Sequence, residues 1–234
     1  MSYYVRFEDL GLKDYKEVWD YQEELLKSMI ETKLRLRSGD AAGSDSAIPR
    51  LIFVEHPHVY TLGKSGSDNN LLLNYIQLQA KNAAYYHIDR GGDITYHGPG
   101  QIVGYPIIDL EVLGIGLREY IHMLEEAVIQ TIAEYGIVGE HLTGASGVWL
   151  DTAKAGSTRK ICAIGVRVSR SVTMHGFAFN VNTDLEYFKH INPCGYTDKG
   201  VTSLAKELGR EIDYEEVKGV LRGKLAAVFG LDFL

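Results

Sequence analysis

The sequence predicts an α/β (α+β) fold in which one mixed β-sheet is flanked by helices. Segments with the alternation of β-strands dominate the middle of the 234-residue chain, and helical segments are interspersed among them without a regular βαβ repeat. The composition agrees, because 45% hydrophobic and 24% charged residues are typical of a folded globular protein. A chain of this length can bury one sizeable core, so we expect a single domain over residues 1–234.

Three segments have the apolar spacing of amphipathic helices. The first covers residues 14–36, and Asp14 is placed to cap its N-terminus. The second covers residues 117–135 and is followed by Gly136, a residue type that often ends a helix. The third begins near Asp213.

The remaining regular segments are rich in β-branched and aromatic residues, which indicates strands. Small polar residues at 38–47 predict a surface loop ahead of them. The expected strands cover residues 50–55, 59–63, 85–90, 101–110, 146–150, 160–168 and 175–183.

The charge balance excludes several classes of protein. With 24 basic and 31 acidic residues the net charge is −7, which argues against non-specific binding to nucleic acid or to an anionic membrane. No segment has the roughly 18 uncharged apolar residues that a membrane span needs, and charges interrupt the first 17 residues where a signal peptide would be apolar. We therefore expect a cytoplasmic protein.

The cysteines and the paired histidines do not predict a metal centre. Cys162 and Cys194 are too few for a disulfide framework and lack the CxxC spacing of structural zinc sites. His56 and His58 could mimic a metal pair, but no third ligand with a recognisable spacing follows. We expect these histidines to be structural and the protein to hold no metal.

A glycine-rich segment, RGGDITYHGPGQ at residues 90–101, lies between two expected strands. Glycines allow the backbone to approach a ligand closely, Arg90 offers a planar set of donors, and His97 can donate or accept near neutral pH. The segment could equally be a tight hairpin with a surface histidine.

The segment KICAIGVRV contains one lysine and one cysteine. A strict period of two places Lys160 and Cys162 on the same, otherwise apolar side of the strand, where a lysine must reach water, pair or lose its proton. Cys162 is expected to be an inert core residue. Cys194, between Pro193 and Gly195, is instead predicted to lie on an accessible turn, with Lys160 or His97 as candidate activators.

Five basic residues follow one another among the charged residues between Asp151 and Asp184. Such a run is usually a solvated strand edge, and the sharper hypothesis is a docking face for an acidic partner. The residues are Lys154, Arg159, Lys160, Arg167 and Arg170.

Four stretches occur in the order RGGDITYHGPGQIVGYPIIDL, KICAIGVRV, HGFAFNVNTDLEYFKHINPCG and VTSL. Between about residues 50 and 208 they make the chain closely resemble the lipoyl(octanoyl) transferases, the octanoyl-acyl carrier protein:protein N-octanoyltransferase family. The resemblance implies the fold of biotin and lipoate protein ligases. It also implies transfer of an octanoyl or lipoyl group from acyl carrier protein to a specific lysine of lipoyl domains, with no cofactor. The expected acceptors are the lipoyl domains of 2-oxo acid dehydrogenases and the glycine cleavage H protein.

The same resemblance assigns roles to individual residues. Cys194 matches the cysteine that forms the acyl-thioester intermediate, and Lys160 matches the lysine that lowers the pKa of that thiol. The expected substrate-binding residues come from the glycine-rich segment and from two further strands, where small side chains would let an acyl chain lie against bare backbone. They are Arg90, Gly91, Gly92, Asp93, Ile94, Thr95, Tyr96, His97, Ala163, Ile164, Gly165, Gly176, Phe177 and Ala178.

Three other functions remain as alternatives. An ATP-dependent lipoate protein ligase would share the fold without needing a cysteine nucleophile, and many ligases carry an accessory C-terminal domain for which we expect no room before Leu234. A cysteine hydrolase using Cys194 and His97 would release free octanoate. A non-catalytic acyl-binding or carrier-binding module would form no covalent adduct.

Overall fold

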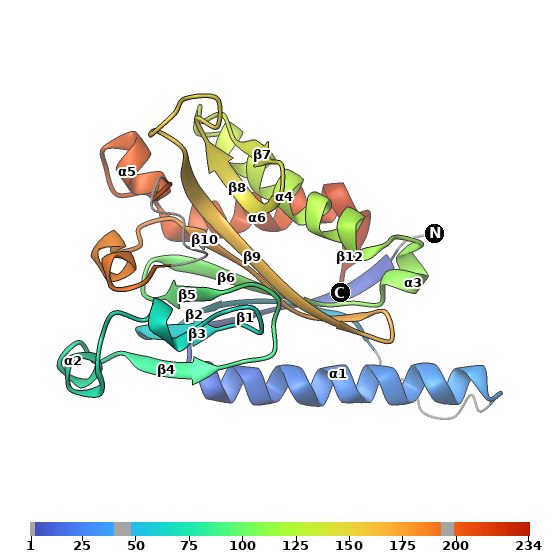
Figure 1. Ribbon diagram of the computed structural model, residues 1–234. Coiled ribbons are helices and arrows are strands. Elements are labelled where there is room, and N and C mark those ends of the chain that lie inside the picture. Colours follow the sequence, from blue (N-terminus) through green and yellow to red (C-terminus); the bar gives the residue numbers. More distant parts are fainter. Residues whose placement is uncertain (1–2, 40–47, 193–198) are drawn as a thin grey trace.

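The computed structural model describes residues 3–39, 48–192 and 199–234, which form two β-sheets and the helices around them (Figure 1). The larger sheet has nine strands. In spatial order its main path is β12 (Leu231–Phe233), β1 (Tyr3–Leu12), β2 (Arg50–Glu55), β6 (Gln101–Ile107), β10 (Val172–Asn180), β9 (Arg159–Ser169), β8 (Ala145–Leu150) and β7 (Glu140–Leu142), and β11 (Gly200–Val201) pairs with β9.

The strand directions confirm the predicted mixed sheet. Strand β1 runs parallel to both of its neighbours, β12 and β2. From β2 to β7 every neighbouring pair is antiparallel, whereas β11 lies parallel to β9. Strand β1 was not expected, because the charges of its sequence YYVRFEDLGL obscure the alternation, and in this part only Val5 is completely buried.

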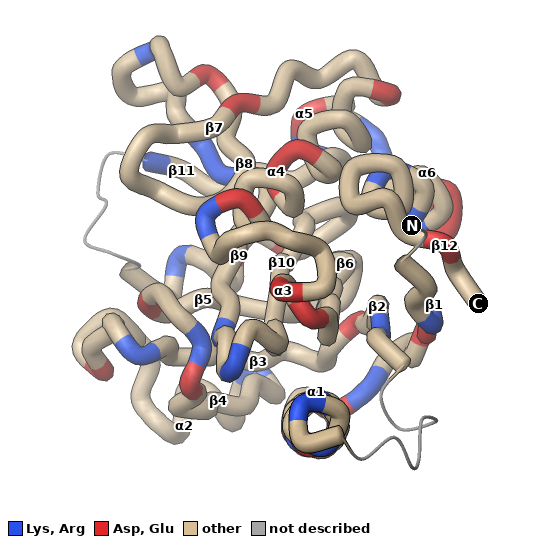
Figure 2. Tube along the Cα trace, turned by 90° about the vertical axis from the view of Figure 1, so that its right-hand side faces the viewer, with Lys and Arg blue, Asp and Glu red and all other residues tan. Residues whose placement is uncertain are grey.

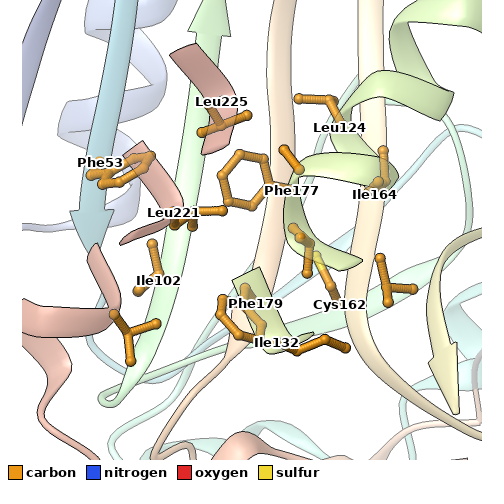
Figure 3. Close-up of a cluster of buried hydrophobic side chains, with 14 of the residues drawn as sticks. Phe53, Ile102, Leu124, Ile132, Cys162, Ile164, Phe177, Phe179, Leu221 and Leu225 are labelled. Carbon is orange, nitrogen blue, oxygen red and sulfur yellow. The ribbon is translucent and has the colours of Figure 1, made fainter. Parts of the chain in front are cut away.

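Helices cover both faces of the larger sheet (Figure 1). On one face α4 (Leu117–Ala133) and α6 (Tyr214–Phe229) enclose the main core, in which Phe177 and Phe179 meet Leu124 and Leu221 (Figure 3). On the other face α1 (Tyr15–Arg37) packs on β2, β6 and β10. The short helices are α2 (Tyr75–Ala80), α3 (Leu110–Leu113) and α5 (Leu204–Leu208), with 3₁₀ turns at Asp68–Asn70 and Leu185–His190.

The three long helices begin or end close to the residues that the sequence analysis named. The carboxylate of Asp14 accepts hydrogen bonds from the first-turn amides of α1, and that of Asp213 does the same for α6. Gly136, with φ of +77°, ends the turn that follows α4. Among the described residues no helix combines the length and apolarity needed to cross a bilayer.

A smaller sheet of three strands stands beside the larger one. It contains β4 (Ala84–His87), β3 (Val59–Leu62) and β5 (Ile94–His97), in that order. Strand β5 lies inside the glycine-rich segment, which is therefore not a simple hairpin turn. The phenol of Tyr60, on β3, donates to the carbonyl of Tyr187 in the second 3₁₀ turn and ties this turn to the small sheet.

Candidate active site

A cavity of about 510 Å³ lies between the small sheet and strands β9 and β10 of the large one. This volume is within the range of small-molecule sites. Its lining includes most of the residues that the sequence singled out. These are Arg90, Gly92, Asp93, Ile94, Thr95, His97, Lys160, Ala163, Ile164, Gly165, Gly176, Phe177 and Ala178.

Two residues of the expected binding loop do not line this cavity. Tyr96 is completely buried beside Tyr60, and its phenol bonds to Nδ1 of His58 at 2.7 Å. The amide of Gly91 donates to the carbonyl of Val166, on β9, at 2.9 Å. These residues anchor the loop, one to the small sheet and the other to the large sheet.

Arg90 supports the loop backbone from inside. The side chain is buried, and its guanidinium donates to the carbonyl and hydroxyl of Thr61 and to the carbonyl of Gly91. Gly165, directly beneath, leaves the space for this arginine, because a Cβ there would lie 2.9 Å from the Gly91 carbonyl and 3.0 Å from Cδ of Arg90.

His97 lies in the cavity wall as a neutral imidazole. Its Nδ1 is 2.8 Å from the side-chain carbonyl of Gln101, whose amide donates to the Tyr96 carbonyl and to Asn180, so Nδ1 carries the proton. Burial, with a contribution from His56, lowers the pKa of His97 to about 3. His97 is therefore uncharged at neutral pH, with Nε2 as an acceptor.

Lys160 reaches the cavity because β9 contains a bulge. Val148 pairs with Cys162 but the next residue, Trp149, pairs with Lys160, which leaves Ile161 as an extra residue. Ile161 and Cys162 are both completely buried in the main core. The expectation that Lys160 shares a face with Cys162 is therefore wrong, since the bulge turns Lys160 to the opposite side.

The Lys160 ammonium has defined neighbours at this side of the sheet. It donates to the carbonyl of Ser146 at 3.1 Å and lies 4.4 Å from the centre of the Trp149 ring. Val201, on β11, pairs with Lys160 on the other edge of β9. The chain that follows Cys194 in sequence is thereby brought beside this lysine.

The glycines of β9 and β10 are held by close packing within the protein. A Cβ on Gly176 would lie only 2.1 Å from the carbonyl oxygen of Gly104, and a Cβ on Gly104 would meet the ring of Phe177 at the same distance. These glycines, like Gly165, are required by the close approach of the protein's own backbone and side chains.

The two cysteines have separate positions. Cys162 is completely buried among apolar side chains, and burial raises the pKa of its thiol, as expected for an inert core residue (Figure 3). Cys194 lies outside the described residues. The described residues that flank that segment, Asn192 and Lys199, both line the cavity.

The run of basic residues does not form one docking face. Arg159 pairs with Asp151 and Glu207, and Arg167 pairs with Glu23 and Asp89. Lys154 also pairs with Asp151. Figure 2 shows acidic segments interspersed with basic ones over the molecule. The cavity lining is more basic, since Arg90 and four lysines (Lys160, Lys189, Lys199 and Lys206) accompany two acidic residues, Asp93 and Glu186.

His56 and His58 hold the framework beneath the cavity, as expected. Nδ1 of His56 is 2.8 Å from the Lys13 carbonyl and Nε2 is 2.9 Å from the Tyr105 phenol. Burial lowers the pKa of His56 to about 4. His58 stacks on Tyr187, with ring centres 4.1 Å apart.

Several residues around the site gave no signal in the sequence. Glu125, on α4, accepts the Gly147 amide at 2.8 Å and so fixes the strand that carries Ser146. Gly147 has φ of +112°, which only glycine adopts readily. His175, at φ of +59° in the cavity wall, is buried and bonds to Asp89 at 3.0 Å. A histidine or glutamate inside a strand or helix pattern does not reveal such contacts.

Comparison with known proteins identifies the family. Residues 14–226 match the lipoyl protein ligase A/B catalytic domain. A protein of Bacteroides fragilis strain YCH46 named octanoyltransferase is 56% identical over 221 residues, which cover 94% of this chain and 95% of that protein. An octanoyltransferase of Flavobacterium johnsoniae is 54% identical over 230 residues, covering 98% of both chains.

Solved structures share the fold at much lower identity. A bipartite lipoate protein ligase from Thermoplasma acidophilum superposes with a TM-score of 0.68 at 14% identity, over 98% of this chain and 85% of that one. LipL1 of P. falciparum, solved with lipoate, gives a TM-score of 0.69 at 10% identity, over 97% and 62%. The predicted lipoate-ligase-like fold is confirmed. The chain belongs to the lipoyl protein ligase A/B catalytic domain family and, within it, to the octanoyltransferases, which are acyltransferase enzymes.

Proposed function

We propose that this protein moves an octanoyl group from acyl carrier protein to a specific lysine of a lipoyl domain through a thioester on Cys194. The acceptors that we propose are lipoyl domains of 2-oxo acid dehydrogenases and the glycine cleavage H protein, in the cytoplasm. The whole chain acts as one catalytic domain, and the reaction needs no cofactor. A lipoyl group is a second acyl cargo of the same site.

The position of Lys160 carries this proposal. The bulge of β9 brings its ammonium to the cavity, and the pairing of Val201 with Lys160 brings the chain after Cys194 to the same place. Cys194 is two residues beyond Asn192, a cavity residue, and an extended chain covers at most about 7 Å in two residues. This connectivity supports placing the thiol at the same cavity.

The chemistry proceeds in two acyl transfers. The Cys194 thiolate attacks the carbonyl carbon of the carrier's thioester, the carbon–sulfur bond to the carrier breaks, and the carrier's thiolate takes up a proton. The neutral amine of the acceptor lysine then attacks the new thioester. It loses a proton as the amide forms and the Cys194 thiolate leaves. Exchange of one thioester for another is nearly isoenergetic, and formation of the amide drives the second step.

Lys160 is the cation that favours the Cys194 thiolate in this mechanism. A positive charge beside a thiol stabilises the thiolate and lowers its pKa. His97 does not supply this charge, because its imidazole is neutral with a pKa of about 3. Its acceptor nitrogen, Nε2, faces the hydroxyl of Thr61 at 3.5 Å.

The remaining lining residues suit an acyl chain delivered by an acidic carrier. Ala163, Ile164, Phe177 and Ala178 supply apolar contacts along the cavity, beside the backbone of Gly165 and Gly176. The excess of basic over acidic residues in the lining favours approach of a partner that carries negative charge. This distribution replaces the basic run of β9 as our proposed basis of carrier recognition.

Intact mass measurement tests the proposal directly. The protein is mixed with octanoyl-acyl carrier protein without ATP, analysed, and then mapped by peptide. We expect one octanoyl adduct on Cys194, which disappears when a lipoyl domain is added while the acceptor lysine gains the same mass. Cys194→Ser should form no stable thioester, and Cys162→Ala should behave as the native protein.

The alternatives give different results in the same experiment. A ligase would modify the lipoyl domain only with ATP and free acid. A hydrolase would release octanoate without modifying the acceptor, and a binding module would give no adduct. Any of these three results overturns the proposed mechanism.

A further inference from the structure

A second cluster of ligating side chains lies away from the cavity, where α4 contacts β7 and β8. His122, Glu125 and His141 each present a ligand atom, and these atoms all lie within 4.8 Å of one another. It is the one group of this kind in the part of the chain that the structure describes. His122 and Glu125 are three residues apart on α4 and therefore share a helix face, and His141 comes from β7.

The separations of these groups suit a small transition-metal ion. Nδ1 of His141 is 2.8 Å from Oε2 of Glu125. Metal bonds of about 2.0–2.2 Å in a tetrahedral site place neighbouring ligand atoms a little over 3 Å apart, so an ion in place of the shared proton needs only a small opening of this contact. The centres of the His122 and His141 rings are 4.4 Å apart, so both imidazoles lie close enough to bind the same ion.

Outer partners already orient the proposed ligands. The other carboxylate oxygen of Glu125, Oε1, accepts the Gly147 amide at 2.8 Å, and this bond can persist when Oε2 binds an ion. On the far side of the His141 ring, Nε2 lies 3.7 Å from the carboxylate of Glu126. Metal-bound histidines commonly donate their second nitrogen to a carboxylate, and a shift of less than 1 Å would bring Glu126 from 3.7 Å to hydrogen-bond distance.

The exposure of the three side chains would leave one coordination position of a bound ion open to solvent. The Glu125 side chain is only 10% exposed, while that of His141 is 37% exposed and His122 is also exposed. A buried carboxylate with two accessible imidazoles leaves room for water as a fourth ligand. Without a metal, the same contacts amount to a hydrogen bond between His141 and Glu125 beside a stacked imidazole.

We propose that His122, Glu125 and His141 form a binding site for one Zn²⁺ ion, separate from the catalytic cavity. Two imidazoles and one carboxylate are a ligand set that zinc accepts and that magnesium and calcium, which prefer oxygen, do not favour. The ion joins α4 to β7.

Calorimetric titration of the chelator-treated full chain with ZnCl₂ tests this site. The same titration is made with His122→Ala, with His141→Gln and with Cys194→Ser, because thiolates also bind zinc. His87→Gln is the matched control, since His87 is an exposed histidine paired with Asp68 at 2.8 Å without a second imidazole. Co²⁺ absorption reports whether the ligands are nitrogen and oxygen or sulfur.

We expect one ion per chain at neutral pH. His122→Ala and His141→Gln should each weaken Zn²⁺ binding about tenfold or more, whereas His87→Gln and Cys194→Ser leave it unchanged. The Co²⁺ spectrum should lack sulfur charge-transfer bands. Absence of saturable binding, an affinity equal to that of the native protein in His122→Ala and His141→Gln, or loss of binding in Cys194→Ser each overturns the proposal.

Discussion

The Lys160 ammonium lies 4.4 Å from the centre of the Trp149 ring, and the two residues are direct partners in the pairing of β8 with β9. The ring face and the Ser146 carbonyl hold the charge at the cavity rather than in bulk water. In the proposed mechanism this charge favours the thiolate of Cys194.

Replacement of Lys160 should make Cys194 a poorer nucleophile. Lys160→Ala removes the cation that favours the thiolate, so we expect the thiol pKa to rise by about one unit and alkylation at neutral pH to slow roughly tenfold. The rate of iodoacetamide labelling as a function of pH measures this. Lys160→Arg keeps the charge and should recover part of the rate. An unchanged pH profile in Lys160→Ala would remove its proposed role.

Native labelling should distinguish the two cysteines. Cys162 is completely buried and its pKa is raised, so we expect a thiol reagent to modify Cys194 alone until the protein is unfolded. Peptide mapping after labelling with and without denaturant gives the comparison. Rapid native modification of Cys162 would contradict its placement in the main core.

Gly176→Ala should destabilise the fold. The added methyl group would lie 2.1 Å from the Gly104 carbonyl oxygen, in the middle of the sheet, and overpacking of this kind costs about 1–3 kcal/mol. Urea unfolding measures the loss. Gly219→Ala is the matched control, because nothing lies within 4 Å of a Cβ there and alanine in a helix is favoured by about 1 kcal/mol. Equal effects of the two substitutions would be inconsistent with this packing.

Acid should destabilise the protein through its buried histidines. The pKa of His56 is lowered to about 4 and that of His97 to about 3, mainly by burial, so both stay neutral when folded but take up protons near pH 6.5 when unfolded. The stability that these two neutral imidazoles contribute is fully present above pH 6.5 and is lost progressively as the pH drops towards 4. Each residue contributes at most about 1.4 kcal/mol per pH unit.

Urea unfolding at pH 7.5 and pH 5.0 checks this dependence. His56→Gln should be less stable than the native protein at pH 7.5, because it disturbs the bonds to Lys13 and Tyr105. It should nevertheless lose less stability between the two pH values, because one buried imidazole is gone. A slope identical to that of the native protein would count against titration of His56.

The sequence was sufficient for the features that depend on neighbours in the chain. Asp14 caps its helix as expected and the third helix begins at Asp213 as expected, since helix starts depend on only the next few residues. The glycine-rich segment and the two strands at Ala163 and Gly176 meet around one cavity, as the family resemblance implied.

Features that depend on distant partners could not be predicted. Glu125 has the pattern of an ordinary helical residue, and only the folded sheet brings its carboxylate to Gly147. Arg167 belongs to a run of basic residues in the sequence, but its charge is met by Glu23 from a helix 144 residues earlier. Likewise, nothing in the letters KICAIGVRV distinguishes a regular strand from one with an extra residue.

The extra residue at Ile161 separates the register of β9 from the packing of the main core. Its deletion would leave the pairs Val148–Cys162 and Trp149–Lys160 consecutive, so Lys160 would still face the cavity, while the core would lose one completely buried side chain. In a protein library built on this scaffold, deletion of Ile161 should therefore lower stability rather than misplace the ammonium, and conservative replacements of Ile161 should survive.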